Sequence, residues 1–304
     1  MDAEGGIMSA DGRGDRAVDA FVTHRNLLFT VAYEMLGSAA DAEDVLQETW
    51  LRWADADLTA VRDQRAYLVR ITTRLSLNRL RAVGRRRESY VGSWLPEPLL
   101  TAPDVAEDVE LAESVSMAML LVLETLAPTE RAVFVLREVF DLGYDEIAEA
   151  VDKSPAAVRQ IAHRARAHVA ARRPRGMVSP AETRRALTAF RLAVETGDVQ
   201  GLLDVLAPDV VLLGDGGGIK QAVLRPVAGA DKVARLLCST HARVATMSLH
   251  YAQVNGHPAL VLRLDGELDT VLALRVDGGL ISGVYAVRNP EKLSHMRSET
   301  ALRR

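Results

Sequence analysis

Apolar residues recur every three or four positions through the first 170 residues, and they alternate with polar residues in the last 60. The first spacing predicts amphipathic helices, and the second predicts strands with one buried face. Gly-containing turns (NGHP, DGEL and DGG) separate the strand-like runs, which favours antiparallel hairpins. Helices are expected at 17–36, 41–54, 64–83, 113–126, 144–151, 154–169, 181–196, 199–206 and 231–238. Strands are expected at 248–254, 259–264, 269–276 and 280–287.

Two segments interrupt this periodicity. Residues 88–112 hold prolines and acids with little periodicity, and residues 174–180 read PRGMVSP. We predict a disordered lead at 1–16, a helical domain at 17–87, a linker at 88–112 and a second helical domain at 113–173. A short linker at 174–180 then leads to an α+β domain at 181–295 and a tail at 296–304.

Residues 144–169 have the pattern of a helix-turn-helix. Asp152 and Lys153 form the turn, Ser154 is placed to cap the second helix, and Pro155 occupies the first helical position, where no hydrogen-bond donor is lost. The exposed stripe of that helix carries four polar side chains among small residues: Arg159, Gln160, His163 and Arg164. Arg and Gln can read guanine and adenine in the major groove, so this helix is a candidate DNA reader. The alternative is a solvated basic face on an ordinary helical hairpin.

The distribution of charge strengthens the DNA interpretation. The net charge is −4, yet residues 64–87 hold eight arginines and no acid, and residues 153–176 hold seven basic residues and no acid. A polyanion meets such local patches and not the total charge. In the helix at 64–83, we expect Arg70, Arg74, Arg79 and Arg81 to neutralise phosphates, while Asn78 suits a base edge; some of these arginines serve only solvation.

The remaining composition excludes several classes of protein. A single cysteine, Cys238, rules out a disulfide framework and a cysteine-based zinc site. Apolar runs are too short to cross a membrane, and the first residues lack a secretory signal. We therefore expect a cytoplasmic protein with no metal and no cofactor.

In this order and spacing, the motifs resemble the extracytoplasmic-function (ECF) sigma factors of the sigma-70 family over about residues 17–173. DAEDVLQETWLRW resembles sigma region 2.2, LSLNRLRAVGRRR resembles region 2.4, and LAPTERAVFVLREVFDLGYDEIAEAVDKSPAAVRQIAHRARA resembles region 4. Asp152 stands where the family often has Gly in the turn. The resemblance places region 2 at 17–87 and region 4 at 113–173, each all-α.

The resemblance implies a subunit of RNA polymerase with no catalytic residues of its own. It places Asp44, Gln47, Glu48 and Arg52 on a surface that binds the clamp helices of the β′ subunit, and region 4 near the β flap. Region 2 would recognise and melt the −10 promoter element, and region 4 would read the −35 element. Ser154 would approach a phosphate through the helix N-terminus.

Three short motifs resemble the sigma J-like subgroup, whose C-terminal domain is a SnoaL-like cone of the NTF2 superfamily. They are WLPEP at 94–98, DGGGIK at 215–220 (DGGGK is usual) and NPEKL at 289–293 (NPDKL is common). The resemblance implies that the C-terminal domain regulates the activity of the sigma factor in cis, through contacts of the DGGGIK loop with region 2 or with the WLPEP linker. The residues implied are Trp94, Leu95, Pro96, Asp215, Gly216, Gly217, Gly218, Lys220, Asn289, Pro290 and Leu293. A small ligand bound in the cone is a further possible partner.

Two other functions remain as alternatives. A conventional ligand-responsive DNA-binding regulator would bind duplex DNA tightly without polymerase. A SnoaL-type enzyme would use an acid or histidine in an apolar cone, with Asp209, Asp215, His241 and His250 as candidates. Neither alternative uses the 41–54 helix or the arginine-rich helix.

Overall fold

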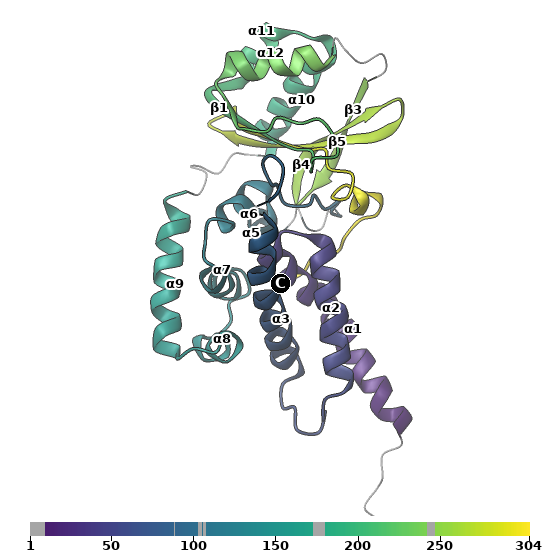
Figure 1. Cartoon of the computed structure of the whole chain (residues 1–304), viewed down its shortest axis with the longest axis vertical. Coiled ribbons are helices and arrows are strands. Elements are labelled where there is room, and N and C mark those ends of the chain that lie inside the picture. The colour runs from purple at the N-terminus through teal and green to yellow at the C-terminus, as the bar shows by residue number, and fades with distance from the viewer. Residues whose placement is uncertain (1–9, 88, 103–104, 106–107, 173–179, 242–246) are drawn as a thin grey trace, which may run out of the picture. The chain divides into compact units, whose positions relative to one another are not determined.

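The computed structural model describes residues 10–87, 89–102, 105, 108–172, 180–241 and 247–304, and they form two compact units (Figure 1). The first unit comprises Met1–Ala82, Leu126–Ala167 and Leu302–Arg304. The second comprises Val83–Thr125 and His168–Ala301. The limits of these units differ from the predicted domain limits, because residues 113–125 of the predicted 113–173 domain belong to the same unit as the C-terminal domain.

The first unit is helical throughout. Its elements are α1 (Ala10–Leu36), α2 (Ala39–Ala54), most of α3 (Gln64–Arg87), α7 (Pro128–Phe134), the π-helix η1 (Val135–Val139), α8 (Tyr144–Val151) and most of α9 (Pro155–Ala170). Its core includes Leu28, Tyr33 and Trp53, all fully buried, and the Trp53 indole donates to the carbonyl of Ala17 over 2.8 Å.

Three local predictions for these helices were wrong. α1 begins at Ala10, inside the segment expected to be disordered, whose residues 1–9 lie outside the described residues. α2 begins at Ala39 and not at the expected residue 41, because the Ser38 Oγ accepts from the amide of Asp41 over 3.1 Å and so caps the helix. α3 continues through Gly84, because a single Gly costs a helix only about 1 kcal/mol.

The helix-turn-helix has the expected geometry. Asp152 adopts the left-handed conformation (φ 55°, ψ 57°), which Asp tolerates better than most residues. The Ser154 Oγ accepts from the amide of Ala157 at 3.2 Å and so begins α9. Val158, Ala162, Ala165 and Val169 are buried along one side of α9, as their spacing predicts.

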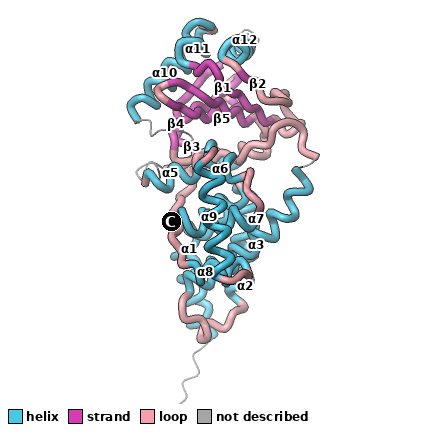
Figure 2. Tube along the Cα trace, turned by 90° about the vertical axis from the view of Figure 1, so that its left-hand side faces the viewer, coloured by secondary structure: helices cyan, strands magenta, loops and turns pink. Residues whose placement is uncertain are grey.

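The second unit is built on one mixed sheet (Figure 2). The strand order is β2-β1-β6-β5-β4-β3. The strands are β1 (Leu206–Asp215), β2 (Val227–Ala228), β3 (Met247–Val254), β4 (His257–Leu264), β5 (Glu267–Asp277) and β6 (Leu280–Val287). All pairs are antiparallel except β1 with β6. The antiparallel meander β3–β6 agrees with the prediction, whereas β1 was not expected as a strand.

Each face of the sheet is covered by different elements. Helices α10 (Pro180–Thr196), α11 (Val199–Val205) and α12 (Ala230–His241) pack on one face, around the fully buried Phe190 and Leu260. The other face receives the linker residue Leu95, α6 (Met117–Leu123) through Met117, and Leu293 from the chain's end. α5 (Val109–Val115) and the 3₁₀-helix η2 (Ser294–Arg297) complete this unit. Among the described residues, no helix is long and apolar enough to cross a bilayer.

Candidate functional site

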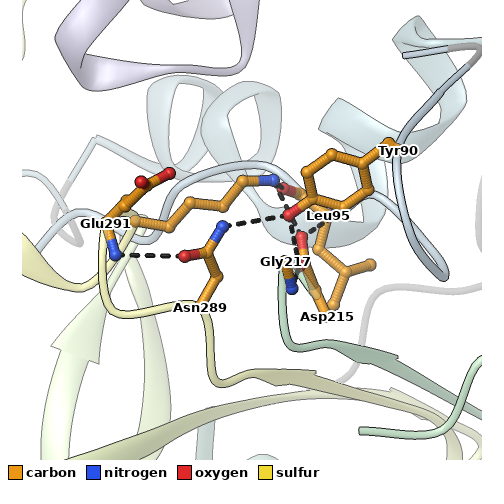
Figure 3. Close-up of polar contacts among 7 residues, drawn as sticks. Tyr90, Leu95, Asp215, Gly217, Asn289 and Glu291 are labelled. Atoms are coloured by element: carbon orange, nitrogen blue, oxygen red, sulfur yellow. Dashed lines mark hydrogen bonds and ion pairs between the residues drawn. The ribbon is translucent and has the colours of Figure 1, made fainter. Parts of the chain in front are cut away.

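The Asp215 carboxylate, at the end of β1, accepts hydrogen bonds from two distant segments, the linker and NPEKL, and from its own loop (Figure 3). Its Oδ1 accepts from the Tyr90 hydroxyl at 2.5 Å and from the Gly217 amide at 3.0 Å. Its Oδ2 accepts from the Leu95 amide at 2.9 Å and from the Lys292 Nζ at 2.8 Å. Asp215 is fully buried, so the Lys292 ammonium is the charge that compensates it.

Lys292 binds the linker on its other side. Its Nζ also donates to the carbonyl of Leu95, and it lies 4.0 Å from the centre of the Trp94 ring and 5.0 Å from that of Tyr90. A cation held between two aromatic faces gains from the ring quadrupoles, most when it is desolvated. Burial, and then the hydrogen bond to Asp215, raise the pKa of Tyr90, so its phenol stays a donor.

The DGGGIK loop fits against NPEKL because its residues 216–218 are glycines without side chains. Gly217 has φ 63°, and a Cβ there would lie 2.3 Å from the Asn289 Nδ2. Asn289 donates through that nitrogen to the Tyr90 hydroxyl at 3.0 Å and accepts from the amide of Glu291 at 3.1 Å. A Cβ on Gly216 would lie 2.0 Å from the carbonyl oxygen of Lys220. Gly217 therefore permits close contact between the two motifs, and Gly216 permits the tight turn within the DGGGIK loop.

Lys220, grouped with the interdomain residues by sequence, has a different partner. Its Nζ donates to Asp269 at 2.7 Å, and Arg288 binds the same carboxylate at 2.9 Å. Burial alone would raise the pKa of Asp269, but hydrogen bonds from Lys220 and Thr270 and the charge of Arg288 outweigh it and lower that pKa. Lys220 therefore fixes its loop to β5, while Lys292, which sequence reasoning missed, binds the linker.

The linker continues along the sheet beyond this cluster. The Leu99 amide donates to the Asn255 Oδ1 at 3.0 Å, and the Asn255 amide donates back to the carbonyl of Leu99 at 2.9 Å. The Asn255 Nδ2 donates to the carbonyl of Val115 at 2.9 Å. Asn255, in the NGHP turn, was predicted only as a turn residue, yet it ties linker, turn and α5 together.

The predicted linker and tail residues differ in burial. Leu95 is fully buried and Pro96 is buried, whereas Trp94 is half-buried against Lys292. Leu95 is therefore the apolar anchor of the linker, and Trp94 contributes mainly its ring face to Lys292. Leu293 is buried in the same cluster, and Pro290 is exposed.

The predicted polymerase-binding residues share an exposed face of α2. Asp44, Gln47, Glu48 and Arg52 are all exposed, and the Arg52 guanidinium lies 2.6 Å from Glu48. Leu51 lies between them with 66% of its surface exposed, an apolar residue that the sequence analysis did not single out. A single exposed Leu is common on soluble proteins and does not by itself indicate an interface.

Arg79 is not free to serve the predicted phosphate role. It donates to Asp41 at 2.6 and 2.8 Å and to Asp44 at 2.6 Å, so it joins α3 to α2. Burial alone would lower the pKa of Arg79, and these two carboxylates raise it instead. Arg81 and Asn78 are exposed, and Arg70 and Arg74 contact α8 within the same unit.

The predicted DNA-reading residues of α9 are exposed together. Arg159, Gln160, His163 and Arg164 all lie on the side opposite the buried stripe. The Arg159 guanidinium lies 5.6 Å from the centre of the Tyr144 ring, and the Arg164 Nε lies 3.6 Å from Glu130. Both contacts are at the surface and so are weak enough to exchange for phosphate or base contacts.

The candidate catalytic residues do not converge on a cone. Asp209 and His250 are exposed, and Asp215 is engaged by the linker. The side chain of His241 lies outside the described residues.

Comparisons with known proteins find matches to both helical regions and to the whole chain. The family models "Sigma-70 region 2" and "Sigma-70, region 4" match residues 20–86 and 116–169. The chain is 35% identical over 292 residues to the ECF RNA polymerase sigma factor SigJ of Mycobacterium tuberculosis, covering 91% of this chain and 93% of that one. It is 34% identical over 283 residues to a protein of the same organism named "Probable ECF RNA polymerase sigma factor SigI", covering 92% and 96%. The crystal structure of M. tuberculosis SigJ superposes with a TM-score of 0.74 at 34% identity, covering 91% of this chain and 98% of that chain.

Proposed function

Because the chain belongs to the ECF sigma factors, in the subgroup with a C-terminal SnoaL-like domain, we propose that this domain controls promoter use in cis by holding the linker between regions 2 and 4. As a sigma factor, the chain binds RNA polymerase and promoter DNA. It is a transcription initiation factor and not an enzyme. The cytoplasm, where the polymerase acts, is its proposed location.

The proposed polymerase contact is the exposed face of α2 against the β′ clamp helices, with region 4 at the β flap. An acidic, partly apolar face suits a basic partner and speeds association. We expect Glu48→Arg to lose co-purification with core polymerase, while Glu267→Arg, an exposed acid of β5, keeps it. Glu48 is a cleaner target than Asp44, because Asp44 also binds Arg79. Retention by Glu48→Arg would count against this placement.

The proposed DNA contacts divide between two surfaces. Arg70, Arg74, Asn78 and Arg81 of α3 serve the −10 element, and Arg79 is reassigned to the internal tie with α2. Ser154, Arg159, Gln160, His163 and Arg164 serve the −35 element. The support is their exposure or weak surface pairing on two acid-free helices.

The observation that carries regulation in cis is the buried Asp215–Lys292 pair, which binds both the amide and the carbonyl of Leu95. A linker bound in this way cannot move freely, and the path of the linker limits how regions 2 and 4 can be placed on a promoter. Release of Leu95 would therefore change initiation without changing any residue that contacts polymerase or DNA.

The test is run-off transcription by reconstituted holoenzyme from the promoter upstream of the chain's own gene. Full-length Asp215→Asn is compared with wild type and with Asp277→Asn, which removes a carboxylate that pairs with Arg275 at the C-terminal end of β5. We expect Asp215→Asn alone to shift the amount of transcript at equal polymerase binding. An unchanged amount, with Leu95 shown to be released, would refute cis control. Truncation before α10 is unsuitable, because α5 and α6 would lose the sheet on which they pack.

A further inference from the structure

Two arginines of α3 are occupied by a residue of the helix-turn-helix. Arg70 and Arg74 lie one turn apart, on the same side of α3. The Arg70 Nη1 lies 3.0 Å from the Glu149 Oε2, and the Arg74 Nη2 donates to the backbone carbonyl of Glu149 at 2.8 Å. Glu149 belongs to α8, and all three residues belong to the first compact unit. One residue thus offers oxygens to both guanidinium groups.

This arrangement has the chemistry of a phosphate contact. A DNA phosphodiester would present two anionic oxygens to the same pair of guanidinium groups. The Glu149 side chain is 68% exposed and that of Arg70 is 33% exposed, so solvent screens the pair and its strength is modest. A weak, screened contact of this kind can be displaced by a polyanion at high local concentration.

The packing around these arginines is polar for a permanent core. Thr73, next to Arg74 on α3, is fully buried, and its hydroxyl has no hydrogen-bond partner among the described residues. The contact between α1 and α7 has a polar centre too: the buried Arg131 donates to the carbonyl of Glu34 at 2.9 Å, and burial lowers the pKa of Arg131 to about 9. Interfaces this rich in polar groups are typical of domains within one chain that can move apart.

We propose that Glu149 occupies the phosphate-binding position of Arg70 and Arg74 in the free chain, so that region 4 blocks the promoter-contacting side of α3 until the two regions part on polymerase. This inference rests on the proposed role of α3 in promoter binding. In this proposal the competitor for DNA is an acid of the chain itself, Glu149, which pairs with Arg70.

The experiment measures binding of the full-length free chain to a fluorescein-labelled forked duplex carrying the promoter upstream of its own gene, by anisotropy across a salt series. Glu149→Gln removes the competing charge. Asp145→Asn changes an exposed acid of the same helix, for which the described residues show no hydrogen bond or ion pair to α3, and is the matched control. We expect Glu149→Gln to bind about three- to fivefold more tightly at low salt, with a steeper salt dependence, and Asp145→Asn to match wild type.

Two further variants make the test decisive. Adding Arg70→Ala to Glu149→Gln should abolish the gain, because the freed arginine is its source. Glu149→Lys, which repels both arginines, should raise affinity further. Run-off transcription by saturating holoenzyme should be the same for Glu149→Gln and wild type, because the regions have already parted there.

The outcomes separate this inference from the function on which it rests. If neither Glu149 variant binds more tightly, while Arg70→Ala weakens binding by the wild-type free chain, the arginines are already accessible and the blocking contact is refuted. If Arg70→Ala and Arg74→Ala change neither DNA binding nor run-off transcription, the proposed role of α3 fails, and the inference fails with it.

Discussion

Replacing Asp215 by Asn removes one charge from a buried group without changing its size. An amide has one acceptor oxygen where the carboxylate has two. If that oxygen takes the Oδ2 position, the Leu95 amide and Lys292 keep an acceptor, and Tyr90 and Gly217 lose theirs. The opposite orientation exchanges the two pairs. Each orientation leaves two donors facing an NH₂ group, at about 1–3 kcal/mol for each donor that is buried without a partner.

The charge gives a second, independent magnitude. Lys292 is 5% exposed, so the variant leaves an ammonium buried without its carboxylate. Removing one partner of a buried pair typically costs about 3–5 kcal/mol. The two routes describe the same change and are not added. Both place the loss near 3–4 kcal/mol, of the order of a third of the stability of a typical domain.

The assay is hydrogen exchange at the Leu95 and Leu99 amides, together with urea unfolding. A loss of 3 kcal/mol corresponds to exchange about 100-fold faster at Leu95, if opening of the linker limits its exchange. The Leu99 amide, which donates to Asn255, should accelerate less. The double variant Asp215→Asn/Lys292→Met should recover part of the loss, because no buried charge then lacks a partner.

Two results would refute this reasoning. Exchange at Leu95 within threefold of wild type would mean that the carboxylate does not hold the linker. A double variant that loses the full sum of the two single variants would mean that Asp215 and Lys292 act independently, in spite of their 2.8 Å separation.

Three further predictions concern stability and its dependence on pH and salt. Gly256→Ala should lower the melting temperature of the chain, at a cost of about 2 kcal/mol or more, because φ is 72° and the new Cβ would lie 2.7 Å from the Ala112 Cα. Arg79→Ala should lower the free energy of unfolding in urea by about 1 kcal/mol, because the ion pair with Asp41 is lost. Arg81→Ala should leave that free energy unchanged. It should reduce the slope of the logarithm of the DNA-binding constant against the logarithm of salt concentration by about one. Burial lowers the pKa of His257 below the value of about 6.5 that the residue has in the unfolded chain. As the pH drops through 6.5, the unfolded chain takes up a proton that the folded chain does not, so the stability of the fold decreases. His257→Gln should make the melting temperature depend less on pH between about 5 and 7.

The sequence predicted those features that depend on local patterns. Helical periodicity placed α2, α9 and α10, and the capping signal at Ser154 located the start of α9. Turn signals located the β3–β6 meander, in which Asn255 and Gly256 adopt the positive φ values that such hairpins require. The two acid-free stretches identified the basic helices.

What the sequence did not reveal depends on contacts between distant residues. β1 pairs with β6 in parallel, and neighbouring residues carry no signal of such a pairing. Lys292 and Lys220 are chemically alike, and only the fold decides that the first meets Asp215 and the second meets Asp269. Arg79 has the same local pattern as Arg74, yet two acids of α2 lie within its reach. Identical side chains on one helix thus have different roles, set by what packs against them.

The order of the linker contacts along the chain has a consequence during synthesis. Tyr90 and Leu95 leave the ribosome early, whereas Asp215 follows Leu95 by 120 residues and Lys292 follows it by 197. At about 5–20 residues per second, the ribosome needs roughly 10–40 s to make that remainder. The sequence of region 4 is complete at residue 173, and the 119 residues from there to Lys292 take roughly 6–24 s at that rate, during which the linker lacks its contact with Lys292. Every newly made molecule therefore passes through a stage in which both sigma regions have been synthesised, while the C-terminal residues that bind their linker have not.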